Sequence, residues 1–214
     1  MQLTLRSLYD KLSQQMGPSG WWPADSKAEI ICGAILIQNT NWRNADRAVA
    51  NLRERTHFDP QKLHQLADEE LQALVRPAGF FHNKTRALQA IFSWLAAYEF
   101  DYARAAKTFG GNLRKELLKL PGIGQETADV LRVYVFYQAT FVSDKYARTL
   151  FAHLGAGNFK AYQALARRCH LDEQFTLADA QEFHGLIDEF GKQYLRGHDH
   201  FNESFLANDQ LLLI

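Results

Sequence analysis

The sequence has few of the features that define several large classes of protein. It contains two cysteines, Cys32 and Cys169, and 5 prolines among 214 residues. Two widely separated thiols are too few for a disulfide framework or a four-thiolate metal cluster, and we expect a reduced, intracellular setting. No run of about 18 apolar residues is present, and charged residues interrupt the N-terminal stretch, so the sequence predicts neither a membrane span nor a signal peptide.

Net charge is also lacking, because 24 lysines and arginines balance 24 aspartates and glutamates. No overall positive field draws the chain toward a polyanion, which argues against a protein that coats or packages nucleic acid. Any nucleic-acid binding must come from a local basic face. What the sequence does have is 47% hydrophobic residues. A chain of this length can bury about 70% of the surface that it exposes when unfolded, so it needs no cross-links to fold.

Apolar residues recur at helical spacing along nearly the whole chain, and sustained strand-like alternation is absent. Turn and cap residues separate the segments; Asp59-Pro60, for example, is a typical helix start. The pattern therefore predicts an all-α fold. The expected helices are 3–15, 27–37, 42–55, 60–65, 68–75, 82–97, 101–107, 110–118, 125–137, 145–154, 159–169 and 177–195. No long linker marks a domain border, so two lobes sharing a cleft would have to be interwoven in sequence.

The segment 118–131, LKLPGIGQETADVL, carries the strongest local signal. Pro121 ends one helix, and Gly122 and Gly124 let the backbone turn sharply and come close to a ligand. Backbone amides at the start of the next helix would then point outward and bind an anion, such as a DNA phosphate. A plain turn between two helices is the alternative interpretation.

Basic residues cluster just before this hairpin. Between positions 104 and 119 there are five of them and one acid, Glu116. The five are Arg104, Lys107, Arg114, Lys115 and Lys119. They give the local basic face that the neutral total lacks, although a solvated basic helix is the simpler reading.

The stretch LPGIGQETAD resembles the helix-hairpin-helix of the endonuclease III superfamily of DNA glycosylases, in which a catalytic aspartate follows the motif at a fixed distance. Asp144, in FVSDKY, stands at the matching distance from Gly124. The resemblance implies a helix-hairpin-helix DNA glycosylase fold with two interwoven helical lobes flanking a cleft. The expected lobes are 28–137, with the hairpin at 118–131, and 1–27 plus 138–214, with the aspartate. The DNA-binding residues implied here are Gly122, Gly124, Gln125, Thr127 and Lys145.

Cleavage of an N-glycosidic bond develops positive charge on the sugar, which a nearby carboxylate stabilises. Asp144 could supply that charge, or it could orient or deprotonate the attacking water, and the sequence does not separate these roles. Asp144 could also be only the N-cap of the helix that begins at Lys145. The two interpretations are compatible, because a capping carboxylate is held rigidly.

The sequence departs from the superfamily pattern at two positions that matter for chemistry. Members that also cut the DNA strand use a hairpin lysine two residues after the second glycine, and this chain has Glu126 there. Glutamate forms no imine, so the resemblance implies a monofunctional enzyme without lyase activity; Lys145 is the nearest rival amine. Many relatives hold an iron-sulfur cluster with four C-terminal cysteines, and residues 184–214 contain none. We expect no cofactor except a monovalent cation held by backbone carbonyls of Leu118, Leu120 and Ile123.

Three further stretches resemble the bacterial 3-methyladenine DNA glycosylase branch of this superfamily: GWWP at 20–23, IQNTNW at 37–42 and RPAGFFHNK at 76–84. The resemblance implies that Trp21 and Trp42 sandwich the methylated adenine. Trp22 and Pro23 are the other two residues that we expect in the base pocket. The other DNA-contacting residues that we expect are Gln38, which enters the gap left by the flipped nucleotide, and Phe81 with His82, which form a wedge.

The simpler alternatives for these residues stay open. The tryptophans could be core anchors, Gln38 could cap a helix, and Phe80 or Phe81 could be core. Trp42 stands where the branch has phenylalanine, and Leu186, after Phe183-His184-Gly185, stands where the branch has lysine. These two departures leave the identity of the base open.

The sequence as a whole favours a monofunctional DNA glycosylase of base excision repair that flips alkylated purines such as 3-methyladenine out of double-stranded DNA. A glycosylase for an oxidised or mismatched base, and a non-catalytic relative that binds DNA structures, are the alternatives. We expect a monomer in the bacterial cytoplasm, associated with the nucleoid through DNA and not with membranes.

Overall fold

The computed structural model describes residues 1–197 and 200–213, and helices make up most of this part of the chain. It consists of two compact units. Residues 24–137 form the central unit, and residues 1–23 together with those from 138 onward form the terminal unit. The chain thus enters the terminal unit twice, with the central unit inserted between. The first boundary lies at Ala24, where the sequence predicts residue 28.

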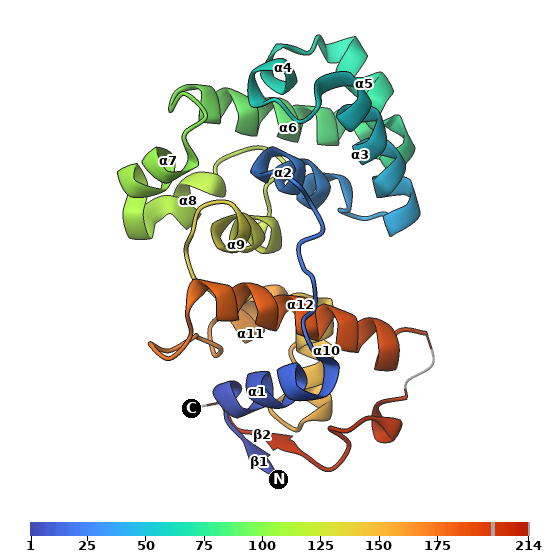
Figure 1. Cartoon of the computed structure of the whole chain (residues 1–214), viewed down its shortest axis with the longest axis vertical. Coiled ribbons are helices and arrows are strands. Elements are labelled where there is room, and N and C mark those ends of the chain that lie inside the picture. The colour runs from blue at the N-terminus through green and yellow to red at the C-terminus, as the bar shows by residue number, and fades with distance from the viewer. Residues whose placement is uncertain (198–199, 214) are drawn as a thin grey trace. The chain divides into compact units, whose positions relative to one another are not determined.

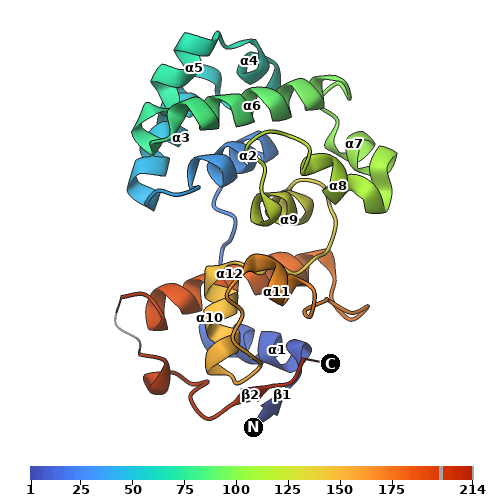
Figure 2. The same ribbon diagram turned by 180° about the vertical axis from the view of Figure 1, so that it is seen from behind.

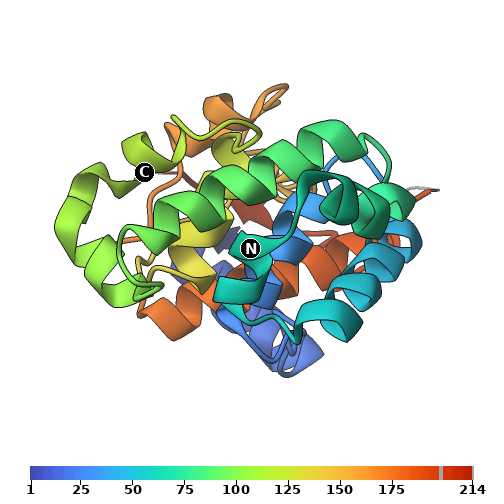
Figure 3. The same cartoon turned by 90° about the horizontal axis from the view of Figure 1, so that it is seen from above.

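The central unit contains most of the helices (Figure 1). They are α2 (Lys27–Leu36), α3 (Trp42–Thr56), α4 (Pro60–Gln65), α5 (Asp68–Val75), α6 (Phe81–Ala96), α7 (Tyr102–Phe109), α8 (Leu113–Leu117) and α9 (Gln125–Tyr134), with 3₁₀ turns at Arg76–Ala78 and Gly110–Asn112. α2 is the centre of this unit, because nearly all of its residues are buried and it packs against α3, α6 and α9. α6 runs across the unit and also packs against α4 and α5 (Figure 3).

The terminal unit joins the two ends of the chain (Figure 2). Its elements are β1 (Gln2–Leu3), α1 (Leu5–Met16), α10 (Lys145–His153), α11 (Tyr162–Ala166), α12 (Leu177–Tyr194), a 3₁₀ turn at Phe201–Glu203, and β2 (Gln210–Leu211). α12 packs against both α1 and α10 around a core rich in leucine and phenylalanine. β1 and β2 form a short parallel pair in which Leu3 faces Leu211.

The predicted all-helical fold is confirmed, because each expected helix is present with its ends displaced by no more than three residues. The largest displacement is at α11, where the helix Tyr162–Ala166 replaces an expected 159–169. The strand pair β1–β2 was not predicted. Each strand has only two residues, too few to produce an alternating pattern, and the pairing joins segments from the two ends of the sequence.

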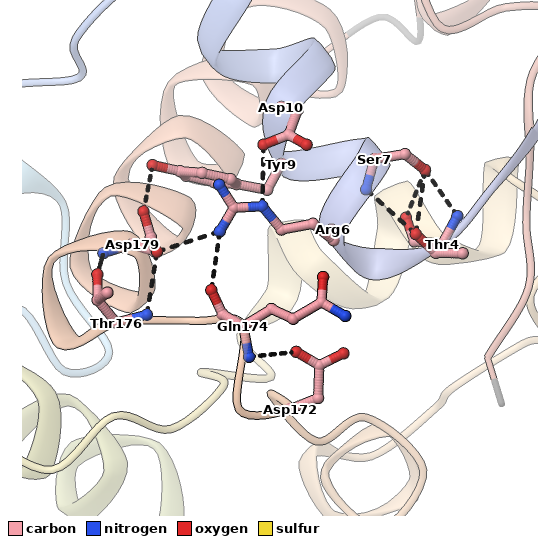
Figure 4. Close-up of polar contacts among 9 residues, drawn as sticks. All are labelled: Thr4, Arg6, Ser7, Tyr9, Asp10, Asp172, Gln174, Thr176 and Asp179. Atoms are coloured by element: carbon pink, nitrogen blue, oxygen red, sulfur yellow. Dashed lines mark hydrogen bonds and ion pairs between the residues drawn. The ribbon is translucent and has the colours of Figure 1, made fainter.

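A network of polar contacts fixes α1 to the start of α12 (Figure 4). The Asp179 carboxylate accepts hydrogen bonds from Arg6 at 3.1 Å and from the Tyr9 hydroxyl at 3.0 Å. Thr176 and Asp179 also form a reciprocal capping box at the start of α12. Burial alone would raise the pKa of Asp179, but the hydrogen bonds from Thr176, Tyr9 and Arg6 lower it. Asp179 thus joins α12, which carries much of the candidate site, to α1 through two hydrogen bonds.

Within the described residues, none of the helices combines the length and the hydropathy that a lipid bilayer demands.

Candidate active site and DNA-binding elements

Asp144 is the N-cap of α10, as its sequence context predicts. The Ala147 amide donates a hydrogen bond of 2.7 Å to Asp144 Oδ1, which fixes the rotamer of the carboxylate. Only 8% of the residue is exposed. One oxygen therefore serves the helix, while Oδ2 lies 3.6 Å from His184 Nε2 on α12. The structure thus gives Asp144 a structural role and leaves a second oxygen available for chemistry.

Trp21 is held against α12 at three points. The Cβ atom of a residue other than glycine at position 185 would lie 2.6 Å from Trp21 Cβ, so Gly185 is what lets the tryptophan approach the helix. The indole N–H donates a 2.8 Å hydrogen bond to Glu189 Oε1. The Lys192 ammonium lies 4.5 Å from the ring centroid. One face of the indole is thus occupied by a cation.

The neighbours of Trp21 connect it to the aspartate. His184 lies edge-on to Trp21 at 6.1 Å between ring centroids, and Trp22 packs edge-on to Trp21 at 5.0 Å. Asp144, His184 and Trp21 therefore form one group within the terminal unit. Trp22 is half-buried and Pro23 is exposed. The fourth residue assigned to the base pocket, Trp42, belongs to the central unit, where it begins α3 and is 47% exposed.

Carboxylates gather around this group on α12. Lys192 forms ion pairs with Asp188 at 2.5 Å and Glu189 at 2.8 Å. Burial raises the pKa of Asp188, with a further contribution from nearby Asp144, even though the Lys192 ion pair acts in the opposite direction. Burial would also raise the pKa of Glu189, but hydrogen bonds from Lys192 and Trp21 lower it. One helix face therefore concentrates acidic groups around a single lysine.

A fourth carboxylate positions the loop that carries Trp21. Glu182 accepts hydrogen bonds from the Ser19 amide at 2.6 Å and from the Ser19 hydroxyl at 2.8 Å. Ser19 also lines a cavity of about 420 Å³, whose walls are residues 16–19 and, on α12, Leu186, Glu189, Lys192 and Gln193. Leu186, whose position is lysine in the resembling branch, is fully buried. Where the resembling branch has a lysine, this chain therefore has an apolar side chain buried in the core.

The hairpin in the central unit turns sharply at its glycines, and the close backbone approach at Gly122 is to α6. Gly122 has φ +77°, and a Cβ atom there would lie 2.6 Å from Ala87 Cβ on α6. Gly124 is the N-cap of α9 and has open space around it. Gln125 and Thr127 begin α9, and Thr127 is buried. The turn is packed on α6, and the start of α9 has room for a ligand near Gly124.

Gln38 contacts the hairpin rather than capping α2. Its amide nitrogen donates to the Gly122 carbonyl at 3.1 Å and to the Thr127 hydroxyl at 2.9 Å. Three residues assigned to DNA binding are therefore brought together.

The basic stretch before the hairpin is largely neutralised. Arg114 makes a bidentate contact with the buried Asp129, which also accepts from Arg132. Arg104 pairs with Glu99, and Lys119 pairs with Glu116 at 2.6 Å. The stretch thus contributes less free positive charge than a count of its residues predicts.

The structure also places the remaining predicted residues. Phe80 is 66% exposed and has a left-handed backbone at the start of α6, whereas Phe81 is half-buried against His82, with ring centroids 4.1 Å apart. Phe80, for which core packing was one interpretation, is thus more exposed than Phe81, the residue expected in the wedge. Lys145, the first residue of α10, and Glu126 are both exposed. The candidate cation ligands are in the hairpin: Leu118, Leu120, whose carbonyl accepts from the Ile123 amide at 3.2 Å, and Ile123.

Sequence reasoning gave no role to several residues that the structure places in or beside the site. They include three residues of α12 that contact Asp144 or Trp21, namely His184, Glu189 and Lys192. The only sequence signal for them was their position on one predicted helix. Lys84 is buried and donates to the carbonyls of Leu36 and Ala78, both at 2.8 Å. Burial lowers the pKa of Lys84 to about 8. This lysine joins the end of α2 to the segment before α6.

Comparisons with known proteins identify the family of this chain. A family model described as "HhH-GPD superfamily base excision DNA repair protein" matches residues 32–171. The chain is 34% identical over 192 residues to the protein named "Putative DNA repair glycosylase MJ1434" of Methanocaldococcus jannaschii, covering 88% of this chain and 87% of that one. The chain therefore belongs to the HhH-GPD superfamily and is a DNA repair glycosylase of that class.

Two solved structures have a similar fold. The H. pylori 3-methyladenine DNA glycosylase MagIII, bound to 1,N6-ethenoadenine, has a TM-score of 0.70 and 26% identity, covering 89% of this chain and 98% of that chain. A non-covalent complex of endonuclease III with DNA has a TM-score of 0.71 and 18% identity, covering 94% of this chain and 91% of that one. The second likeness shows the shared fold.

Proposed function

We propose that this glycosylase is monofunctional and hydrolyses the N-glycosidic bond of alkylated purines, such as 3-methyladenine, after flipping the base from double-stranded DNA. The observation that carries the proposal is the group Asp144, His184 and Trp21 in the terminal unit, bordered by acidic side chains of α12. It combines a rigid carboxylate with an aromatic surface, which are the two elements that base release requires.

The charges around Trp21 favour a cationic base. Four carboxylates lie on the residues around Trp21, and Lys192 forms ion pairs with two of them. They are Asp144, Glu182, Asp188 and Glu189. A positively charged alkylated base gains from both the acidic surroundings and the face of an indole. Because such a base is already a good leaving group, the site needs no strong acid to protonate it.

The geometry of Asp144 suits stabilisation of the sugar. Since Ala147 holds Oδ1, the carboxylate cannot rotate freely, and its charge is fixed in position before the transition state forms. The same oxygen, or Oδ2, could orient a water molecule for attack. In either role, the aspartate must be ionised.

The residue at hairpin position 126 supports a monofunctional mechanism. Glu126 occupies the hairpin position at which strand-cutting relatives have lysine, and Lys145 begins α10 with its side chain exposed. No imine with the sugar is then expected, and water completes the reaction.

For DNA binding, we propose that the backbone at the start of α9, next to Gly124, binds a phosphate without reading sequence. A monovalent cation at the carbonyls of Leu118, Leu120 and Ile123 would add to this contact. Gln38 is partly exposed beside the hairpin, and Phe80 is an apolar side chain available for insertion between base steps.

One observation favours a second candidate, a glycosylase for a neutral lesion. The Lys192 ammonium already occupies one face of Trp21 and competes with a cationic base for the electrons of the ring. A neutral modified base would not meet this competition. The buried Leu186, in place of the lysine of the resembling branch, is a further reason to test neutral bases.

A lesion panel tests the proposal. Duplex DNA carrying one defined lesion would be incubated with the protein and analysed before and after hot alkali, with borohydride added to a parallel sample. We expect release of 3-methyladenine, strand cleavage only after alkali, and no trapped adduct. Efficient release of a neutral base with no release of 3-methyladenine would favour the second candidate, and an adduct at Lys145 would overturn the monofunctional mechanism.

A further inference from the structure

His184 contacts both the carboxylate and the aromatic residue of the candidate site, Asp144 and Trp21. Its Nε2 atom is 3.6 Å from Asp144 Oδ2, and its ring lies edge-on to Trp21. Only 9% of the residue is exposed. The imidazole is thus a buried polar ring placed beside the oxygen of Asp144 that does not cap the helix.

The packing of α10 on α12 fixes this approach. A Cβ atom at Gly191 would lie 2.2 Å from Tyr146 Cγ, so the backbone of α12 and the first turn of α10 are in direct contact at this glycine. Glycine at position 185 similarly lets Ser19 and Trp21 lie against the helix next to His184. Neither partner of the Asp144–His184 contact can move far without disturbing a packed core.

A separation of 3.6 Å is longer than a hydrogen bond, but catalytic contacts are often long in the free enzyme and shorten when substrate binds. An imidazole with its proton on Nε2 would donate to Oδ2 and leave the aspartate ionised. It would restrict the carboxylate to one orientation without removing the negative charge that opposes the cationic sugar.

From this geometry we infer that His184 is a positioning residue for the catalytic carboxylate, donating from Nε2 to Asp144 Oδ2. The inference rests on the proposed function, because positioning the Asp144 carboxylate matters only if this carboxylate takes part in base release. Misplacing a reacting group by about 1 Å can lower a rate by about a hundredfold, which sets the size of effect that the contact can have.

The first test needs no substrate. In protein labelled with ¹⁵N-histidine, the nitrogen chemical shifts report which imidazole nitrogen carries the proton, and His184→Gln identifies the resonances by their loss. Asp144→Ser keeps a side chain that caps helices but is too short to reach the imidazole. We expect the wild-type ring to carry the proton on Nε2 and the Nε2 resonance to shift in Asp144→Ser. An unchanged resonance would overturn the inference.

The second test uses base release. In glutamine the amide nitrogen can occupy the place of Nε2, whereas in asparagine it stops near Nδ1. We expect His184→Gln to retain kcat within about threefold and His184→Asn to lose about ten- to a hundredfold, with KM little changed. His170→Gln, at an exposed histidine of the same unit, is the control.

The inference would be overturned if both variants lost base release equally and thermal melts showed a matching loss of folded protein. His184 would then have only a packing role. If the wild type released no base from any lesion, the proposed function would fail, while the nitrogen shifts would still decide whether the contact exists.

Discussion

The central and terminal units differ in how the sequence specifies their functional elements. In the central unit, the hairpin is a local structure: its glycines, its proline and the start of α9 lie within 118–131, and a short motif specifies them. In the terminal unit, the site is assembled from three separate segments, namely the loop at 19–22, the start of α10 and one face of α12. The hairpin proposed to bind a phosphate is therefore encoded locally, whereas the proposed chemistry depends on long-range packing.

The largest effect should come from the residue on which the terminal site depends. Asp144→Asn keeps the capping oxygen but removes the charge, so base release should fall by about a hundred- to a thousandfold while the melting temperature stays near wild type. Kinetics on the best lesion, beside thermal melts, measure both quantities.

Asp101 offers a matched control, because it caps α7 through the Arg104 amide in the same way. Asp101→Asn should change neither quantity. Near wild-type turnover in Asp144→Asn would remove this carboxylate from the mechanism and leave it as a helix cap alone.

This contrast also explains what the sequence could predict. The helices 60–65 and 68–75 agree with α4 and α5 at both ends, because proline and acidic residues begin them and the apolar spacing is regular. α9 stops at Tyr134 rather than at 137, because the chain leaves the helix at Val135 and reaches a left-handed conformation at Tyr137. The apolar spacing there continued beyond the helix and gave no sign of this ending.

The site shows the same limit. Asp144 and the hairpin glycines were predictable from motifs of adjacent residues. The pairing of Arg114 with Asp129, and the clamp of Glu189 and Lys192 on Trp21, join side chains that only the folded packing brings together. The sequence could therefore predict the members of the site more readily than their partners.

A pair of glycine substitutions separates fold from binding within the hairpin. Gly122→Ala places a methyl group against Ala87 and forces a left-handed backbone, so we expect a loss of about 1–3 kcal/mol in the free energy of unfolding. Gly124→Ala meets no neighbouring atom and should leave the melting temperature nearly unchanged. If the phosphate binds next to Gly124, the added methyl group should still weaken DNA binding.

Chemical denaturation and DNA titration of both variants provide the measurements. A Gly124→Ala protein that binds DNA as well as wild type would contradict the proposed backbone contact, whatever the stability of Gly122→Ala.

Replacing Lys192 tests whether charge selects the base in the terminal unit. Lys192→Met removes the cation from the face of Trp21 and leaves Asp188 and Glu189 without their ion-pair partner. We expect the kcat/KM ratio of a cationic to a neutral lesion to rise by about two- to fivefold, the equivalent of 0.5–1 kcal/mol of cation–π energy. Lys192→Arg keeps the charge and should leave the ratio unchanged. Equal losses on both lesions would indicate that Lys192 only supports the structure around Trp21.

The smallest expected effect distinguishes the two exposed lysines beside the hairpin. Lys119 is paired with Glu116, whereas Lys115 is exposed on α8. If Lys115 contacts a phosphate, Lys115→Ala should reduce the slope of log affinity against log salt concentration by about 0.9, and Lys119→Ala should reduce it less. Lys62→Ala, at an exposed position of α4, is the control for a general loss of charge. Equal changes in all three variants would indicate that the protein responds to total charge, and the basic stretch would then have no specific part in binding, in contrast to the backbone of the hairpin.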